Sequence, residues 1–203
     1  MNLELFERNV ESWFDKVKAT HWESGYRWYK HAYQFASHLS EETGLPLENV
    51  VGVIAALSPQ VSWESNCYSA ESVVRYAQID KRYGGYYANV EKAYQCLTAP
   101  PLKVLGGAKV LAFYHNILNP YNPEYVTIDT HIARILFDTL ELTDKHIAYI
   151  FSKKGNSLAQ QCLRKVASHR NVNPVALQAA LWLCVREYTQ NKINKDQLDL
   201  YVK

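Results

Sequence analysis

Apolar side chains recur at helical spacing through most of the chain. Over residues 2–20 and again over 22–42 they return every three or four positions, which predicts two amphipathic helices. Gly44 is well placed to end the second helix, and Pro46 suits the first turn of a third. This third helix, predicted over 47–57, is apolar on nearly all sides, so we expect it to be central and buried.

The middle of the chain alternates short helical patterns with turns. Ser62 is a candidate N-cap for the next helix. A polar, tyrosine-rich link over 80–89 leads to a short helix, and Pro100 and Pro101 are expected to break the chain before a glycine turn. After that turn, the pattern predicts a helix over 107–118.

The rest of the chain contains further helical patterns and no convincing strand pair. One follows Asp129 as far as Leu140, and another runs from a Thr143 cap to about residue 151. A Gly155-Asn156-Ser157 break is expected before the next helix, and Asn173-Pro174 opens a strong helix over 175–188. The chain is therefore predicted to be all-α, with roughly ten helices and short connections.

Size and composition fit a self-contained globular chain. Its 203 residues, 48% of them hydrophobic, suffice for one large domain or two small lobes that share a core. The longest apolar run, residues 50–57, is far too short to span a bilayer. No signal peptide is recognised, so we expect a soluble, cytoplasmic protein with no membrane partner. The sequence does not disclose the oligomeric state.

Charge and aromatic content leave nucleic-acid binding open. The formal net charge of +2 does not mark a nucleic-acid binder, although a local basic face is compatible with it. Tyrosine is frequent, at 15 residues, and tyrosines can stack on bases. A helical core with tyrosine edges accounts for most of them.

The cysteines give no sign of a metal centre. Cys67, Cys96, Cys162 and Cys184 are at least 22 positions apart, which excludes a local metal or cluster motif. Their helical, partly apolar surroundings predict reduced, buried thiols. We therefore expect no metal site and no iron–sulfur cluster.

Asp129 is the first candidate for chemistry. A β-branched, apolar approach ends at this aspartate and a helical pattern begins there, so its carboxylate is expected to lie on free N–H groups. It is either a simple N-cap or a carboxylate that activates water or stabilises positive charge on a sugar ring. His131 and Arg134 follow on the same helix, as packed or surface residues or as parts of a site.

A glycine turn lies about 20 residues upstream of Asp129. Gly106 and Gly107 leave room for backbone N–H groups to approach a phosphate oxygen. Lys109 follows at the start of a helix, where a lysine opposes the helix dipole. A buried Lys109 is a candidate nucleophile that forms a Schiff base with a sugar carbon, and an exposed one is a phosphate contact or a solvated surface residue.

A third polar cluster surrounds the turn after the helix over 47–57. It consists of Gln60, Ser62, Trp63 and Asn66. A glutamine can insert into a duplex and pair with an orphaned base edge, and a tryptophan can stack on a base. The alternative is a cluster that caps the turn and packs locally.

The order of these motifs resembles the helix-hairpin-helix DNA glycosylase superfamily, in particular its endonuclease III branch. That branch has a Leu-Ser-x-Gln turn, a glycine hairpin with a lysine, and a Val-Asp-Thr-His-x-x-Arg stretch. The matching segments here are residues 57–60, 105–109 and 126–134, and the resemblance covers roughly residues 45–140. The hairpin departs from the usual Leu-Pro-Gly-x-Gly-x-Lys pattern, and the C-terminal four-cysteine motif is absent from the sequence.

The resemblance implies two helical lobes with a DNA-binding cleft between them. Lobe A would cover about 45–125, with the hairpin near 102–112, and lobe B about 1–44 plus 126–203. Asp129 would be the catalytic carboxylate and Lys109 the Schiff-base lysine. DNA would be the partner, a monovalent cation could lie under the hairpin, and no iron–sulfur cluster is implied. The implied DNA contacts are Gln60, Ser62, Trp63, Asn66, Gly106, Gly107, His131 and Arg134.

Three functions stay open on this sequence. The first is a DNA glycosylase of repair or modification that flips out a damaged or modified base and cleaves its N-glycosidic bond, with lyase activity if Lys109 attacks the sugar. The second is a bacteriophage enzyme of the same fold, in the host cytoplasm, that hypermodifies thymine or another pyrimidine. The third is a non-catalytic DNA- or protein-binding module. The base that is recognised is not disclosed.

Overall fold

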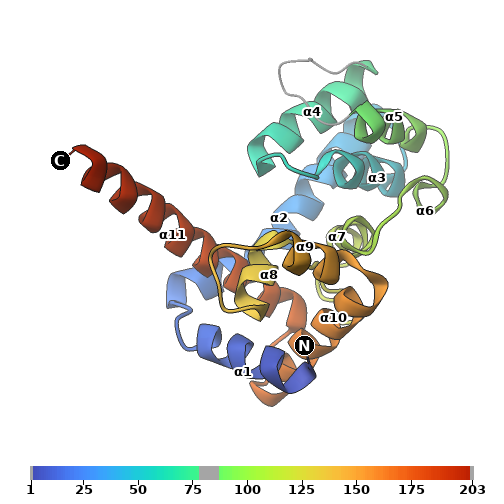
Figure 1. The fold of residues 1–203 in the computed structure, drawn as a ribbon. Helices are drawn as coiled ribbons and strands as arrows, with labels where there is room; N and C mark the ends of the chain where they lie inside the picture. The colour runs from blue at the N-terminus through green and yellow to red at the C-terminus, as the bar shows by residue number, and fades with distance from the viewer. Residues whose placement is uncertain (1, 78–86, 202–203) are drawn as a thin grey trace. The chain divides into compact units, whose positions relative to one another are not determined.

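The structure is a computed structural model that describes residues 2–77 and 87–201, and side chains as far as residue 191. Within these residues the chain is all-α, with eleven helices and no strand, which confirms the predicted fold class (Figure 1). The tyrosine-rich link expected over 80–89 lies outside the described residues except for its last three positions, which begin α5. The helices are α1 (Leu3–Phe14), α2 (Ala19–Thr43), α3 (Leu47–Leu57), α4 (Trp63–Tyr76), α5 (Tyr87–Cys96), α6 (Pro101–Val104), α7 (Ala108–Leu118), α8 (Thr130–Leu136), α9 (Asp144–Phe151), α10 (Lys153–His169) and α11 (Pro174–Tyr201).

The chain divides into two compact units. Unit 1 contains residues 1–28 and 126–203, so both ends of the chain contribute to it, whereas unit 2 is the continuous segment 29–125. None of the described helices is long and apolar enough to cross a membrane.

The core of unit 2 is built around α3. All residues from Val50 to Leu57 are buried, as expected for a helix whose side chains are apolar in every direction. Helices α4, α5, α6 and α7 pack against it. Gly52 permits the close approach of α6, because a Cβ at this position would lie 2.7 Å from the ring of Pro101. The predicted helix over 47–57 and its central position in this unit are confirmed.

The core of unit 1 joins helices from the two ends of the chain. α1 packs against α8 and α10, and α11 packs against the same two helices. The bulk of this core is aliphatic, with two buried aromatic side chains, Phe6 and Trp13, from α1. Its largest fully buried side chains are Phe6, Ile128, Ile132, Ile135, Leu136, Ile150, Leu163, Leu177 and Leu181.

Local start and stop signals in the sequence have the predicted effect at several helices. Gly44 follows α2 with a φ of +72°, a conformation that favours glycine. Ser62 and Thr143 cap α4 and α9 through their side chains. At the start of α11, the side chain of Asn173 accepts hydrogen bonds from two backbone N–H groups. Pro46 occupies the N-cap position of α3, one residue before its expected place.

The predicted break at Gly155-Asn156-Ser157 is wrong, because these residues lie inside α10. The chain breaks earlier, at Ser152, whose hydroxyl accepts a hydrogen bond from the Gly155 backbone N–H at 3.1 Å. Glycine is present here for packing reasons, since a Cβ at position 155 would lie 2.0 Å from the Tyr149 carbonyl oxygen. A glycine required by a close contact resembles a helix breaker in the sequence.

Four other helix boundaries also differ from the prediction. The helix predicted over 2–20 ends at Phe14, and the next helix begins at Ala19. The helix after Asp129 ends at Leu136, before the expected Leu140, and Asp138 follows it with a φ of +47°. Pro101 begins the short helix α6 instead of simply breaking the chain, because the fixed φ of proline suits a first helical position. The helix predicted over 175–188 continues as α11 to residue 201.

Candidate functional site

Asp129 lies at the end of a buried, extended segment in unit 1. Val126 and Ile128 are fully buried. The Val126 backbone N–H donates to the side-chain oxygen of Gln160 on α10, at 3.2 Å. These contacts hold the approach to α8, so that the Asp129 side chain is presented at the first turn of that helix.

The carboxylate of Asp129 accepts two hydrogen bonds from different parts of unit 1. The residue is the N-cap of α8, as predicted, and its Oδ1 accepts from the Ile132 backbone N–H at 2.9 Å. Its Oδ2 accepts from the indole Nε1–H of Trp182 on α11, also at 2.9 Å. Asp129 is half-buried. Both of its oxygens are therefore oriented while part of the residue stays accessible.

The indole of Trp182 has three further neighbours in unit 1. The guanidinium of Arg186, one helical turn further along α11, lies 4.4 Å from the indole centroid. Trp28 and His131 make edge contacts with the indole, at centroid distances of 5.9 and 5.8 Å. These three side chains contact the indole that donates to Asp129.

His131 and Arg134 contact each other on α8. Arg134 donates from Nη1 to His131 Nδ1 at 3.2 Å and from Nε to the Leu140 carbonyl oxygen at 3.0 Å. A guanidinium can only donate, so Nδ1 of His131 accepts and its ring proton is on Nε2. Arg134 thereby ties α8 to the turn that follows it. Their contacts with DNA stay a prediction.

The glycine turn of unit 2 joins two helices in a short hairpin. Residues 105–107 connect α6 to α7, and Leu105 is buried there. Gly107 has a φ of +83° at the N-cap position of α7, which explains the need for glycine. Gly106 and Gly107 are exposed, and a Cβ on either would meet no described atom within 4 Å. Packing within unit 2 thus leaves this turn open to an approaching group.

Lys109 lies in the first turn of α7 and is half-buried. It belongs to unit 2, whereas Asp129 belongs to unit 1. The role of Lys109 as a Schiff-base lysine stays a prediction from the resemblance.

The turn between α3 and α4 has a local explanation at three of its four candidate residues. Ser62 caps α4 by accepting from the Ser65 backbone N–H at 3.1 Å, and Trp63 makes an edge contact with Phe35. Asn66 is only 2% exposed and donates to the Ile54 carbonyl oxygen on α3, at 3.1 Å.

Gln60 is the fourth candidate in this turn. It is exposed and has a φ of +64°, a conformation that non-glycine residues adopt at a cost of about 1–3 kcal/mol. The roles of this turn in DNA contact stay predictions.

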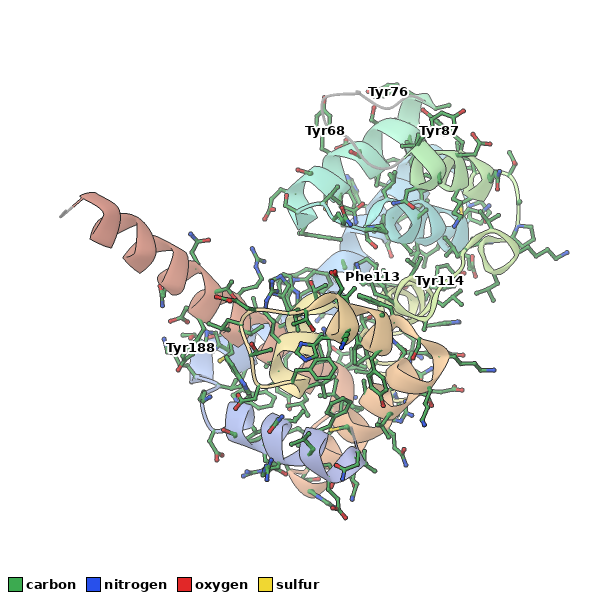
Figure 2. The ribbon with its side chains drawn as sticks, viewed as in Figure 1. Tyr68, Tyr76, Tyr87, Phe113, Tyr114 and Tyr188 are labelled. Carbon is green, nitrogen blue, oxygen red and sulfur yellow. The ribbon has the colours of Figure 1, made fainter. Side chains whose placement is uncertain are left out.

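The tyrosines divide between core and surface, as the composition suggested. Tyr114 of α7 is 3% exposed. Tyr68 and Tyr76 of α4 and Tyr87 of α5 are exposed, and Figure 2 labels all three on these helices of unit 2. Of the other tyrosines whose burial is described, half are half-buried, and Tyr26, Tyr121 and Tyr188 are exposed.

The thiols are free, and burial suppresses their reactivity. Cys96, Cys162 and Cys184 are buried as predicted, whereas Cys67 is half-buried. Burial raises the pKa of Cys96 to about 11 and that of Cys67 and Cys162 to about 12. Across the described residues, no group of three or more His, Cys, Asp or Glu side chains is arranged to hold a metal ion.

Sequence reasoning missed the contribution of Trp182 to this site. Trp182 lies on the apolar side of the last predicted helix, between Leu181 and Val185. This position indicates a packing residue and gives no sign of a functional role. The one available signal is general, because a buried or half-buried indole N–H usually requires an acceptor. Which acceptor it finds depends on how α11 packs against α8, 53 residues earlier.

Fold and site together define an all-α chain of two compact units, with an N-cap aspartate held by a tryptophan from another helix. Residues 1–189 match the model of a family of unknown function (DUF7178), and the chain belongs to this family. No curated protein and no solved structure gave a significant match to the chain.

Proposed function

We propose that the protein acts on a nucleotide of DNA and cleaves the N-glycosidic bond of a damaged or modified base, with Asp129 as the catalytic carboxylate. The observation that carries this proposal is the double hydrogen bond to Asp129, from the Ile132 N–H and from Trp182 Nε1–H. A carboxylate that accepts at both oxygens is oriented as a fixed negative group. Such a group suits the stabilisation of positive charge that develops in a transition state.

The proposed chemistry follows from that role. The bond between C1′ of the sugar and the base nitrogen breaks, and its electron pair leaves with the base. Asp129 stabilises the positive charge that remains on the sugar ring. Water then adds to C1′ and loses a proton, which leaves an abasic site. If the amine of Lys109 adds to C1′ instead, it loses a proton and the C1′–O4′ bond breaks to give a Schiff base with the opened sugar. β-Elimination from this Schiff base then expels the 3′-phosphate and cleaves the strand.

The glycine hairpin of unit 2 supports the DNA part of the proposal. The turn at residues 105–107 is exposed at both glycines and leads directly into α7. Backbone N–H groups at a helix start, without side chains in the way, bind phosphate oxygens. The order of the three motifs along the chain resembles DNA glycosylases, as described above.

The test is mass spectrometry of bases released from, or altered in, a panel of duplex DNAs. The panel contains uracil, oxidised bases, alkylated bases and 5-substituted pyrimidines, and borohydride is added to trap a lysine adduct. Asp129→Asn is the test variant, because asparagine also caps helices well. Asp138→Asn is the matched control, since Asp138 in the same unit also accepts from an indole, that of Trp13 at 3.1 Å.

The outcomes separate the candidate functions. Base release by wild type and Asp138→Asn, but not by Asp129→Asn, supports the glycosylase. A trapped adduct that disappears in Lys109→Ala adds lyase activity. Altered bases without release indicate a hypermodifying enzyme, and DNA binding without any product indicates a binding module. Either of the last two results overturns the proposed reaction.

A further inference from the structure

Asp129 receives one local hydrogen bond and one long-range hydrogen bond. The local bond, from the Ile132 N–H to Oδ1, is the ordinary consequence of an N-cap. One such bond leaves the carboxylate able to turn about its Cβ–Cγ bond, because that torsion is broad. The bond from Trp182 to Oδ2 removes this freedom, because it fixes the second oxygen from a different helix.

Trp182 is itself well held. Its neighbours on α11, Leu181, Cys184 and Val185, are fully buried in the core of unit 1. The guanidinium of Arg186 covers the ring at 4.4 Å, and Trp28 and His131 make edge contacts with it. An indole surrounded in this way is a rigid support for a hydrogen bond.

We infer that Trp182 is a positioning residue, which holds the Asp129 carboxylate in its reactive orientation through the Nε1–H. This inference rests on the proposed function of Asp129. A positioning residue that does not itself touch DNA should affect the rate of the chemical step and leave DNA affinity unchanged. A misplaced catalytic group can lower that rate on the order of 10²-fold.

The chain provides a matched control for this inference. Trp13 on α1 also donates from its indole to an aspartate, Asp138, and both residues belong to unit 1. Trp182→Phe and Trp13→Phe each remove one indole-to-carboxylate hydrogen bond and keep an aromatic ring. Trp13→Phe should cost at least as much stability as Trp182→Phe, because Trp13 is 4% exposed and Trp182 is half-buried, and only Trp182→Phe should affect catalysis.

The first measurement compares the single-turnover rate and the dissociation constant on the duplex that wild type processes. Trp182→Phe should lower the rate on the order of 10²-fold with an unchanged dissociation constant. Trp13→Phe should keep both values. If Trp182→Phe keeps the wild-type rate while Asp129→Asn is inactive, the inference is wrong and the proposed function stands.

A second measurement needs no substrate. In spectra of ¹⁵N-labelled indoles, Asp129→Ala should shift the Nε1–H resonance that Trp182→Phe removes. Asp138→Ala should shift the resonance that Trp13→Phe removes. If the Trp182 resonance does not respond to Asp129→Ala, the hydrogen bond is absent in solution and the inference is overturned. If Asp129→Asn is as active as wild type, the proposed function fails. The spectrum still shows whether Trp182 donates a hydrogen bond to Asp129 in solution.

Discussion

The two units hold their candidate residues in different ways. In unit 1, Asp129 is oriented by a tryptophan 53 residues away. In unit 2, two candidates at the turn before α4 are explained by contacts over shorter separations, Ser65 for Ser62 at three positions and Ile54 for Asn66 at twelve. The hairpin glycines of unit 2 touch little, whereas Gly155 of unit 1 is packed against Tyr149.

Some of these residues are needed for packing between helices, as Gly155 is. Others, such as Gly107, are needed only for the conformation of the local backbone. The Asp129 carboxylate already caps α8 through one oxygen. The long-range hydrogen bond from Trp182 is not needed for this cap, and it orients the second oxygen. The open glycines of the hairpin have the opposite property, because nothing in the core of unit 2 requires their small size. Both features fit residues available for a ligand, and substitutions in the two units should therefore differ in their effects.

The largest contrast is expected between two glycine-to-alanine substitutions. In Gly155→Ala the new Cβ would lie 2.0 Å from the Tyr149 carbonyl oxygen. Because α9 or α10 must then shift, we expect the free energy of unfolding to fall by about 3 kcal/mol or more. In a chain of this size this corresponds to a melting temperature lower by roughly 6–12 °C.

Gly106→Ala is the control for that substitution. Its φ is outside the positive range, and the new Cβ would meet no described atom within 4 Å, so the melting temperature should stay near the wild-type value. Thermal unfolding followed by circular dichroism measures both variants. If both variants lower the melting temperature equally, Gly106 is also required by packing. The proposed difference between the glycines of the two units would then be wrong.

A contrast of intermediate size is expected between the two helix caps. Asp129→Ala removes the cap of α8, at about 1 kcal/mol, and leaves the Trp182 indole without its acceptor, at about 1 kcal/mol more. Ser62→Ala removes only the cap of α4, so about 1 kcal/mol is expected. Urea unfolding measures the two free energies. If Ser62→Ala lowers the free energy of unfolding as much as Asp129→Ala does, the Trp182 hydrogen bond does not contribute to stability.

The smallest effect concerns pH and belongs to unit 2. His115 stacks on Tyr125 at a centroid distance of 3.9 Å, and burial lowers its pKa below 6.5, although Glu124 partly opposes this. The unfolded chain therefore takes up the proton first as the pH falls, and the contribution of His115 to stability is lost below about pH 6.5. In His115→Gln, the free energy of unfolding should fall less between neutral and mildly acidic pH. An identical decline in wild type and variant would contradict this assignment.

The sequence predicted those features that depend on neighbouring residues. The all-α class, the buried helix over 47–57 and the caps at Ser62, Asp129 and Thr143 all follow from spacing or from local hydrogen bonding. Each of these features involves residues within a few positions of each other. Such features can be inferred from the order of residue types along the chain alone.

The features that the sequence did not predict depend on tertiary contacts. The pattern predicts a helix break at Gly155 because a close contact such as that with Tyr149 leaves no sign in the sequence. Trp182 lies in an apolar helical pattern that indicates only packing, because its acceptor lies at the start of another helix. Asn66 is part of a polar cluster in the sequence, and its burial against α3 follows only from its bond to the Ile54 carbonyl oxygen.

The most direct test of the account is the release of free base from duplex DNA by wild type, Asp129→Asn and Asp138→Asn. The three proteins should be compared at equal folded concentration and with DNA binding measured in parallel. The account predicts that wild type and Asp138→Asn release the same base, and that Asp129→Asn binds the same DNA without releasing it. Equal release by wild type and Asp129→Asn would contradict the role of this carboxylate.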